Sequence, residues 1–360
     1  MKKHSTNAEL MHPVGDADAW SESYYFNFVD GNTGVGMFTR MGFRPGDSWA
    51  DALHAIYLPG RRVAFTYGRR EIGPDLAQYD GDLTAGNLTI TLIEPHKRWR
   101  VQYDGPAQDI NDASILLERR KLRPPGWFKD ARLAMDLTFD CITEPHFTSS
   151  NDANTGAYGH FEQSGQVTGK IKLDNEVFDV KGYGVRDKSW GPRDWGAAQR
   201  SGEDKKARDS GPAFSTPQQP APFVNWFSMN FGADAALGGS CFRQPSGELK
   251  GAGWIQRNGE SSALKNVVMT TEYQERSILH DSVVLTGSID GKEPIRITGK
   301  VINMCPTKVP MPGGATFINE GLTKFSWDGT EGFGIAEHWH AVNKGLSLIH
   351  ISEPTRLRRI

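Results

Sequence analysis

The sequence predicts an all-β protein built from antiparallel barrels or sandwiches. Short segments alternate between apolar and polar residues at period two, which is typical of strands with one buried face. Turn residues close nearly every such segment, and no apolar pattern of helical period runs for a convincing length. The 40 glycines and 10 tryptophans among 360 residues agree with a glycine-rich, aromatic-rich β fold.

The first half predicts a meander of short strands. Residues 109–122 are the best helix candidate of the chain, but their periodicity is weak. The segments expected to be strands are residues 23–29, 36–44, 51–58, 62–67, 88–95, 98–105 and 131–142.

A polar, turn-rich stretch at residues 143–156 predicts a domain boundary or a long crossing connection. We therefore expect an N-terminal barrel over residues 1–150 and a C-terminal barrel over residues 151–344. Residues 199–222 are rich in Ser, Gly, Pro and charge, which predicts a disordered surface loop within the second barrel. The expected strands of this half are residues 165–173, 178–187, 223–232, 240–244, 251–257, 266–274, 280–289, 295–302, 314–329 and 332–341.

The last residues have a separate origin. Residues 346–356 read LSLIHISEPTR, which is the translation of a common sequencing adapter. We therefore expect residues 345–360 to be adapter read-through that is not native, and we give them no role in the fold.

Composition excludes several classes of function. The formal net charge is −2 and the Lys/Arg clusters are short and dispersed, so we expect no nucleic-acid partner. No apolar run is long enough for a membrane span. The three cysteines are far apart and odd in number, which favours a reducing, cytoplasmic setting. No nucleotide fingerprint or metal-ligand cluster is visible, so we expect neither a cofactor nor a metal; the oligomeric state stays open.

The stretch GYGVRDKSWGPRDWG, residues 182–196, is the strongest candidate for chemistry. In one interpretation Asp187 is an acid or base and Arg186 or Arg193 orients an oxygen of the substrate. In the other, a buried Arg/Asp network fixes a structural corner, and Trp190 and Trp195 pack around it.

Two further motifs place polar residues at strand period. His160 and Glu162 would share one face, as metal ligands, as a proton relay or, the interpretation we favour, as a hydrogen-bonded pair at a barrel rim. His338 and His340 would also share a face, although no third or fourth zinc ligand is visible.

The chain resembles the two-domain lipocalin-like superfamily that includes carotenoid 1,2-hydratase (hydroxyneurosporene synthase) and AttH-like proteins, and is most similar to a branch defined by paired domains of unknown function. This resemblance implies two lipocalin-like barrels packed side by side, with a site near their mouth or junction. The stretches that carry it are residues 12–28, 38–47, 94–105, 159–169, 184–196 and 225–232.

In the hydratase relatives, an Asp-His-x-Trp-Gly motif and a later Tyr and Asp are ascribed to acid-assisted hydration. Asp187, Trp190 and Gly191 match that motif, and Lys188 replaces its histidine. The later strand offers Phe227 or Ser228, and then Asn230, where the relatives have Tyr and Asp.

We therefore expect a protein that binds, and as an enzyme transforms, a hydrophobic isoprenoid- or steroid-like molecule by hydration, isomerisation or cyclisation. Asp187 would donate the proton, with Arg186, Lys188 and Arg193 as further catalytic candidates. The alternatives are a non-catalytic carrier of a lipophilic ligand and a structural domain with filled barrels. The expected ligand-binding residues are Trp190, Trp195, Trp226, Phe227, Asn230, His160 and Glu162.

Overall fold

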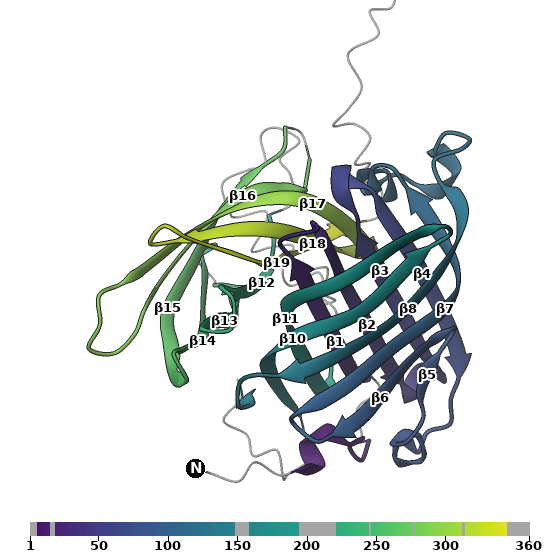
Figure 1. The fold of residues 1–360 in the computed structure, drawn as a ribbon, viewed down its shortest axis with the longest axis horizontal. Coiled ribbons are helices and arrows are strands. Elements are labelled where there is room, and N and C mark those ends of the chain that lie inside the picture. The colour runs from purple at the N-terminus through teal and green to yellow at the C-terminus, as the bar shows by residue number, and fades with distance from the viewer. Residues whose placement is uncertain are drawn as a thin grey trace, which may run out of the picture.

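The protein folds into two antiparallel β-barrels that stand side by side (Figure 1). The structure is a computed structural model and describes residues 6–14, 19–147, 158–193, 221–244, 246–275, 277–311 and 314–343. Within these ranges the only helices are short 3-10 turns: η1 (Thr6–Glu9), η2 (Pro45–Asp47), η3 (Pro59–Arg61), η4 (Leu76–Tyr79), η5 (Ala113–Leu117) and η6 (Arg120–Leu122). None of these helices has the length and apolar composition that crossing a membrane requires.

The first sheet contains eleven strands and closes on itself. Its path runs β4-β3-β2-β1-β11-β10-β8-β7-β6-β5, and a further pairing of β4 with β7 completes the barrel wall. The strands are β1 (Trp20–Asp30), β2 (Val35–Arg44), β3 (Trp49–Tyr57), β4 (Val63–Glu71), β5 (Leu83–Ala85), β6 (Leu88–Glu94), β7 (Arg98–Ile110), β8 (Lys129–Cys141), β9 (His146–Phe147), β10 (Gly159–Leu173) and β11 (Glu176–Pro192).

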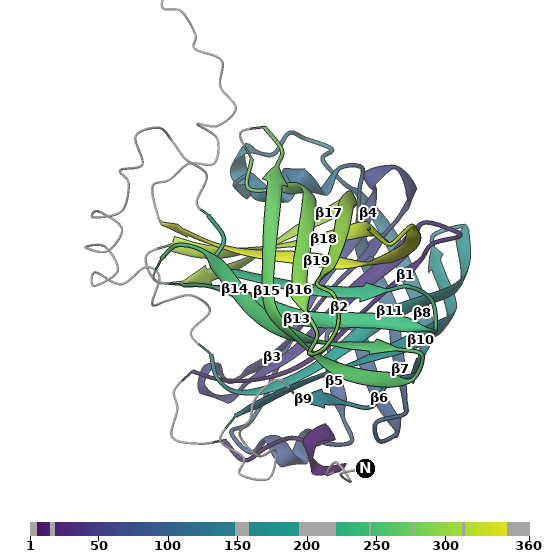
Figure 2. The same cartoon turned by 90° about the vertical axis from the view of Figure 1, so that its left-hand side faces the viewer.

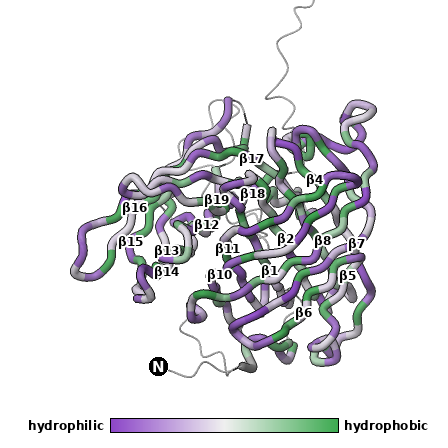
Figure 3. Tube along the Cα trace, viewed as in Figure 1, coloured by the Kyte–Doolittle hydropathy of each residue, from purple (hydrophilic) through white to green (hydrophobic). Residues whose placement is uncertain are grey.

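The second sheet is a closed meander of eight strands in sequence order. Along its strands hydrophobic and hydrophilic residues alternate, as expected for a barrel wall with a buried inner face (Figure 3). The strands are β12 (Val224–Asn230), β13 (Ala235–Arg243), β14 (Leu249–Arg257), β15 (Glu260–Tyr273), β16 (His280–Ser288), β17 (Ile295–Met311), β18 (Gly314–Trp327) and β19 (Thr330–Asn343).

The prediction of two barrels is confirmed, but the strands divide between them differently from the predicted boundary. Strands β10 and β11 pair with β8 and β1, so they belong to the first barrel and not to the second. The polar stretch at residues 143–156 is therefore a connection within one sheet. A sequence pattern shows where strands begin and end, but not which distant strand supplies their hydrogen bonds.

Two local expectations also change. Trp190, Gly191 and Pro192 belong to the stretch that one interpretation treats as a structural corner, but they continue β11. The weak helix candidate at residues 109–122 becomes the two short helices η5 and η6 after the end of β7. Trp195, most of the expected loop at residues 199–222, and the tail from residue 345 lie outside the described residues.

Large side chains fill the interior of the first barrel. The most voluminous fully buried side chains there include Trp99, Tyr24, Phe139 and Phe161. The N-terminal segment closes one end of this barrel, where the Tyr24 hydroxyl donates to the Glu9 carbonyl at 3.0 Å (Figure 1). These side chains form a packed core inside the first barrel.

The barrels meet through a hydrophobic cluster of their own. Strand β11 lies beside β12, and β1 lies beside β19, so the wall of one barrel contacts the wall of the other. Figure 2 shows the second barrel turned toward the viewer, in front of the first. The cluster buries aromatic and aliphatic side chains from both barrels, among them Tyr25, Val185, Trp226, Trp254 and Ile335.

Candidate active site

Strand β11 presents its polar residues to two different environments, because successive side chains of a strand point to opposite faces. Arg186 and Lys188 point into the first barrel, where both are almost fully buried. Asp187 points to the other face, toward the second barrel, and its carboxylate bonds the His160 ring.

The two cationic side chains of β11 inside the first barrel, Arg186 and Lys188, each form an ion pair with a buried glutamate. Both terminal nitrogens of Arg186 donate to the Glu9 carboxylate, at 2.9 and 2.6 Å. The ammonium group of Lys188 donates to Glu22 and lies 4.1 Å from the centre of the Tyr24 ring. The predicted catalytic roles of Arg186 and Lys188 are therefore corrected: they form structural ion pairs in a filled interior, away from the junction.

A row of three polar side chains from the first barrel faces the junction. Tyr25 of β1 pairs in register with Asp187 of β11, and Asp187 pairs in register with Glu162 of β10. Side chains at paired positions of adjacent strands share a face and lie close together. The strand register thus places a phenol and two carboxyl groups side by side.

A second row from the other barrel faces the first. Glu320 of β18 pairs in register with Glu337 of β19, which in turn pairs with Trp226 of β12. The Tyr25 hydroxyl donates to Glu320 Oε2 at 3.0 Å, and Trp226 Nε1 donates to Glu162 Oε1 at 2.6 Å. These two bonds tie the ends of the rows together across the junction.

His160 stands at the solvent side of the first row. Its Nε2 atom bonds Asp187 Oδ2 and lies 3.5 Å from Glu162 Oε1. The side chains of His160 and Asp187 are 24% and 17% exposed, so the pair is reachable from outside while Glu162 is not. Burial by itself would lower the pKa of His160, but the negative charge and hydrogen bond of Asp187 raise it above its ordinary value.

Glu162 is fully buried and held by two indoles. Trp226 and Trp254 each donate an indole N–H to it at 2.6 Å. Burial raises the pKa of Glu162, and His160 and the two indole hydrogen bonds oppose that rise only in part. Gly238 makes the arrangement fit, because a Cβ atom there would lie 2.4 Å from Glu162 Oε2 and 2.7 Å from Trp254 Nε1.

The two glutamates of the second row are both buried and adjacent. Burial raises the pKa of Glu320 well above its usual range, and the neighbouring Glu337 raises it further. Burial also raises the pKa of Glu337, which the charge of Asp187 pushes in the same direction. Two carboxylates this close cannot both ionise without a cation between them.

The junction therefore combines several carboxyl groups beside indole faces. Asp187 is paired with His160, whereas Glu162 and the Glu320–Glu337 pair have raised pKa values. Such a set can give a proton to a substrate at one point and accept a proton at another.

The same side chains also fit a metal ion in part. One ligand atom each from His160, Glu162 and Asp187 lies within 4.8 Å of the others. However, both Glu162 oxygens already accept indole N–H groups, and His160 Nε2 already bonds Asp187. These hydrogen bonds already engage the ligand atoms that a metal ion would need.

The other predicted ligand-binding residues lie in different places. Trp190 is inside the first barrel, and Phe227 is inside the second. Asn230 faces the first barrel and accepts the Ser164 hydroxyl at 2.5 Å. Arg193 follows β11, and its charge acts on the pKa of both His160 and Glu337. Of the predicted set, Asp187, His160, Glu162 and Trp226 come together.

Sequence reasoning missed Tyr25, Trp254, Glu320 and Glu337. A signal for the two glutamates was present, since each interrupts an otherwise apolar strand face at period two. Glu320 stands between Ile318 and Leu322 in this pattern. No comparable signal marks Tyr25 or Trp254 among the many aromatic residues of the strands.

The histidines of the sequence EHWH at residues 337–340 lie inside the second barrel. His338 and His340 are buried there, and the His338 ring stacks on His280 with 3.9 Å between ring centres. The Tyr273 hydroxyl lies 3.2 Å from His338 Nδ1. The motif therefore belongs to the barrel interior and not to the junction.

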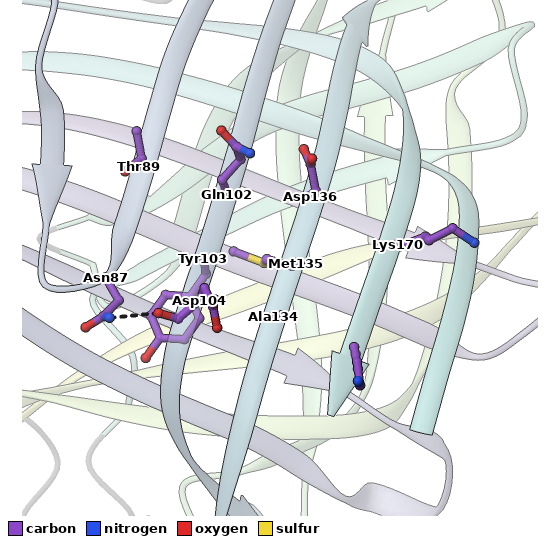
Figure 4. A pocket seen from close by; sticks show the side chains of 10 residues that line it. Asn87, Thr89, Gln102, Tyr103, Asp104, Ala134, Met135, Asp136 and Lys170 are labelled. Atoms are coloured by element: carbon purple, nitrogen blue, oxygen red, sulfur yellow. Dashed lines mark hydrogen bonds between the residues drawn. The ribbon is translucent and has the colours of Figure 1, made fainter. Parts of the chain in front are cut away.

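An open hollow of about 450 Å³ lies elsewhere, on the first barrel (Figure 4). Its walls include Gln102, Asp104, Asp136 and Lys170, which point outward from β7, β8 and β10. Its charged residues are engaged with surface partners, since Asp136 binds Arg100 and Lys170 binds Asp179. The hollow is not connected with the acids of the junction through any residue that lines it.

Comparison with known families identifies the group to which this chain belongs. The model of the family described as Domain of unknown function (DUF7064) matches residues 5–342, so the chain belongs to that family. None of the curated proteins matches this chain in sequence.

Solved structures share the two-barrel, lipocalin-like fold. An AttH-like protein from Nitrosomonas europaea has a TM-score of 0.55 at 14% identity, covering 89% of this chain and 92% of that one. CghA with Sch210972 has a TM-score of 0.51 at 10% identity, covering 91% and 90%. Kievitone hydratase from Nectria haematococca has a TM-score of 0.49 at 10% identity, covering 94% and 96%. At these identities the likeness shows the fold alone.

Proposed function

We propose that this member of the DUF7064 family is an enzyme that binds a hydrophobic small molecule between its barrels and transfers a proton to it. The reaction class is hydratase-like: hydration, isomerisation or cyclisation of an isoprenoid- or steroid-like substrate. The observation that carries the proposal is the acid cluster at the junction, in which Asp187, His160 and Glu162 adjoin the indoles of Trp226 and Trp254.

The chemistry follows from the residues present. A proton added to one carbon of a double bond leaves a cation on the neighbouring carbon. Aromatic faces stabilise a cation, and the junction supplies two indoles and the Tyr25 phenol. Water then adds to the cation and gives its proton to a carboxylate, or a neighbouring carbon loses a proton, or a second double bond closes a ring.

Other observations support the choice of site and ligand. The first barrel is filled by its own side chains, so the ligand would enter between the barrels. The CghA structure contains Sch210972, which supports ligand uptake by this fold. The three cysteines are free thiols, and we propose the cytoplasm as the compartment.

The test begins with the natural ligand. Native mass spectrometry of the protein purified from a lysate should reveal a bound apolar molecule, which is then incubated with wild-type protein, Asp187→Asn and Asp179→Asn. Asp179 is a matched control because it lies on the same strand, 76% exposed and paired with Lys170.

The proposal expects wild type and the control to convert the ligand, and Asp187→Asn to lose about 10²-fold or more of the rate, as removal of an acid–base group does. Release of the ligand unchanged by all three proteins would indicate a carrier. Absence of any bound apolar molecule would favour a structural role for two filled barrels. Loss of turnover on chelation would assign His160, Glu162 and Asp187 to a metal.

A further inference from the structure

We propose that Glu320 and Glu337 hold a single proton between them and that this pair is the proton donor of the junction. The inference rests on the proposed function and assigns its first step to residues outside the quoted stretch around Asp187.

The strand register brings the two carboxyl groups together. Glu320 and Glu337 are directly paired residues of β18 and β19, and both point toward the first barrel. They are 4% and 7% exposed, and side chains at directly paired positions of adjacent strands lie close together. One of two carboxyl groups that lie side by side in a buried site keeps its proton, because two like charges there repel each other.

The surroundings keep that proton in place. Among the described residues no Lys or Arg forms an ion pair with Glu320 or Glu337. The groups that face the pair from the first barrel are the hydroxyl of Tyr25 on β1 and, from β11, the carboxylate of Asp187. Asp187 is a like charge and therefore opposes ionisation of the pair.

Three further side chains adjoin the two glutamates. Cys305 of β17 pairs in register with Glu320 and is a buried thiol. The Trp339 indole donates to Glu337, and the Tyr57 hydroxyl donates to the Glu320 carbonyl at 2.8 Å. Burial raises the pKa of Glu337, and the charge of Arg193 opposes that rise only in part.

In the proposed reaction the Glu320–Glu337 pair donates a proton, and the Asp187 carboxylate beside His160 accepts one. Glu320–Glu337 gives its proton to a carbon of the substrate, and the C=C bond supplies the electrons of the new C–H bond. Water adds to the resulting cation and passes a proton to the Asp187 carboxylate. That proton returns to the glutamate pair, so the enzyme ends the cycle unchanged.

The charge of the junction also selects the substrate. Among the described residues, the acids of the junction (Asp187, Glu162, Glu320 and Glu337) outnumber the cation Arg193 that acts on them. The substrate at this point should therefore be a neutral unsaturated molecule, and a carboxylate or phosphate near the reacting double bond should exclude it.

Infrared difference spectroscopy tests the shared proton without a substrate. At pH 7 ordinary carboxylates are ionised, so a protonated carboxyl group gives a C=O band apart from theirs. Wild type should show this band, and the double variant Glu320→Gln/Glu337→Gln should lose it. Glu331→Gln is the matched control, because Glu331 lies on β19, is 63% exposed and pairs with Lys324.

A further variant separates the pair from its neighbour. Glu162→Gln should retain the band of the glutamate pair, although Glu162 is itself a buried acid. If the double variant fails to fold, the single variants Glu320→Gln and Glu337→Gln carry the same test, because each should shift the pH at which the band disappears.

Two results would overturn the inference: no protonated band in wild type at pH 7, or a band that survives in a folded double variant. Turnover of the co-purified ligand adds a separate readout, with a loss of about 10²-fold or more expected in the double variant. Normal turnover there would refute the donor role while leaving the proposed function intact. A wild type that never converts its ligand would refute both, even if the band is present.

Discussion

Replacing Glu9 with Gln should destabilise the fold without removing the chemistry of the junction. Glu9 is fully buried and accepts both terminal nitrogens of Arg186, while the His96 ring lies 3.0 Å from its carboxylate. Burial alone would raise the pKa of Glu9, but the charges and hydrogen bonds of Arg186 and His96 lower it from 4.5 to about 2. The variant would leave the Arg186 guanidinium buried without its counter-charge.

The magnitude follows from that pKa. One pKa unit corresponds to about 1.4 kcal/mol, so ionised Glu9 contributes about 3 kcal/mol to the unfolding free energy at neutral pH. Removal of one partner of a buried ion pair costs about 3–5 kcal/mol, which agrees. Because the folded pKa is depressed, this contribution is complete above pH 4.5 and disappears as the pH falls toward 2.

Urea unfolding of wild type and Glu9→Gln at several pH values measures both effects. The variant should be about 3 kcal/mol less stable at pH 7, and the difference should shrink below pH 4.5. Equal stability at pH 7 together with lost turnover would refute the reasoning, because it would make Glu9 and Arg186 functional and not structural.

Three further changes probe the junction. Gly238→Ala should cost about 1–3 kcal/mol in urea unfolding, because its Cβ would clash with Glu162 and an indole; unchanged stability would contradict the close approach. Trp226→Phe removes a hydrogen-bond donor to buried Glu162 and should lower the unfolding free energy by about 1–3 kcal/mol, with a further rise in the pKa of that carboxyl visible by NMR. A fall in that pKa would contradict the role of the indole hydrogen bond. Since folding raises the pKa of Glu320 above 4.5, the unfolding free energy should fall as the pH rises beyond that value, and Glu320→Gln should flatten the fall; an identical pH profile in both proteins would show that Glu320 ionises normally.

Many of the strands could be predicted from the sequence, because alternation and turn residues are local signals. The alternating segment at residues 23–29 lies within β1, and the one at residues 332–341 lies within β19. The assignment of β10 and β11 to the first barrel could not be predicted in the same way, because it depends on hydrogen bonds to β1 and β8.

The candidate site was predictable only in the parts that share a strand. His160 and Glu162 were expected on one face, and the structure places them 3.5 Å apart. Strand geometry predicts that Asp187 points to the face opposite Arg186 and Lys188. It does not predict which of the two faces lines the barrel interior. Glu320 joins the site through register with Glu337, across a pairing that no short motif records.

The central claim, that the junction of the barrels transfers a proton to carbon, is tested most directly by turnover in D2O. The ligand that co-purifies with the protein is incubated with wild type, Asp187→Asn and Asp179→Asn, and the masses of the products are measured by mass spectrometry. The account predicts one carbon-bound deuterium in the product of wild type and of the Asp179 control, and about 10²-fold less of this deuterated product in the same time with Asp187→Asn. A product without carbon-bound deuterium in wild type, or equal incorporation by Asp187→Asn, would contradict it.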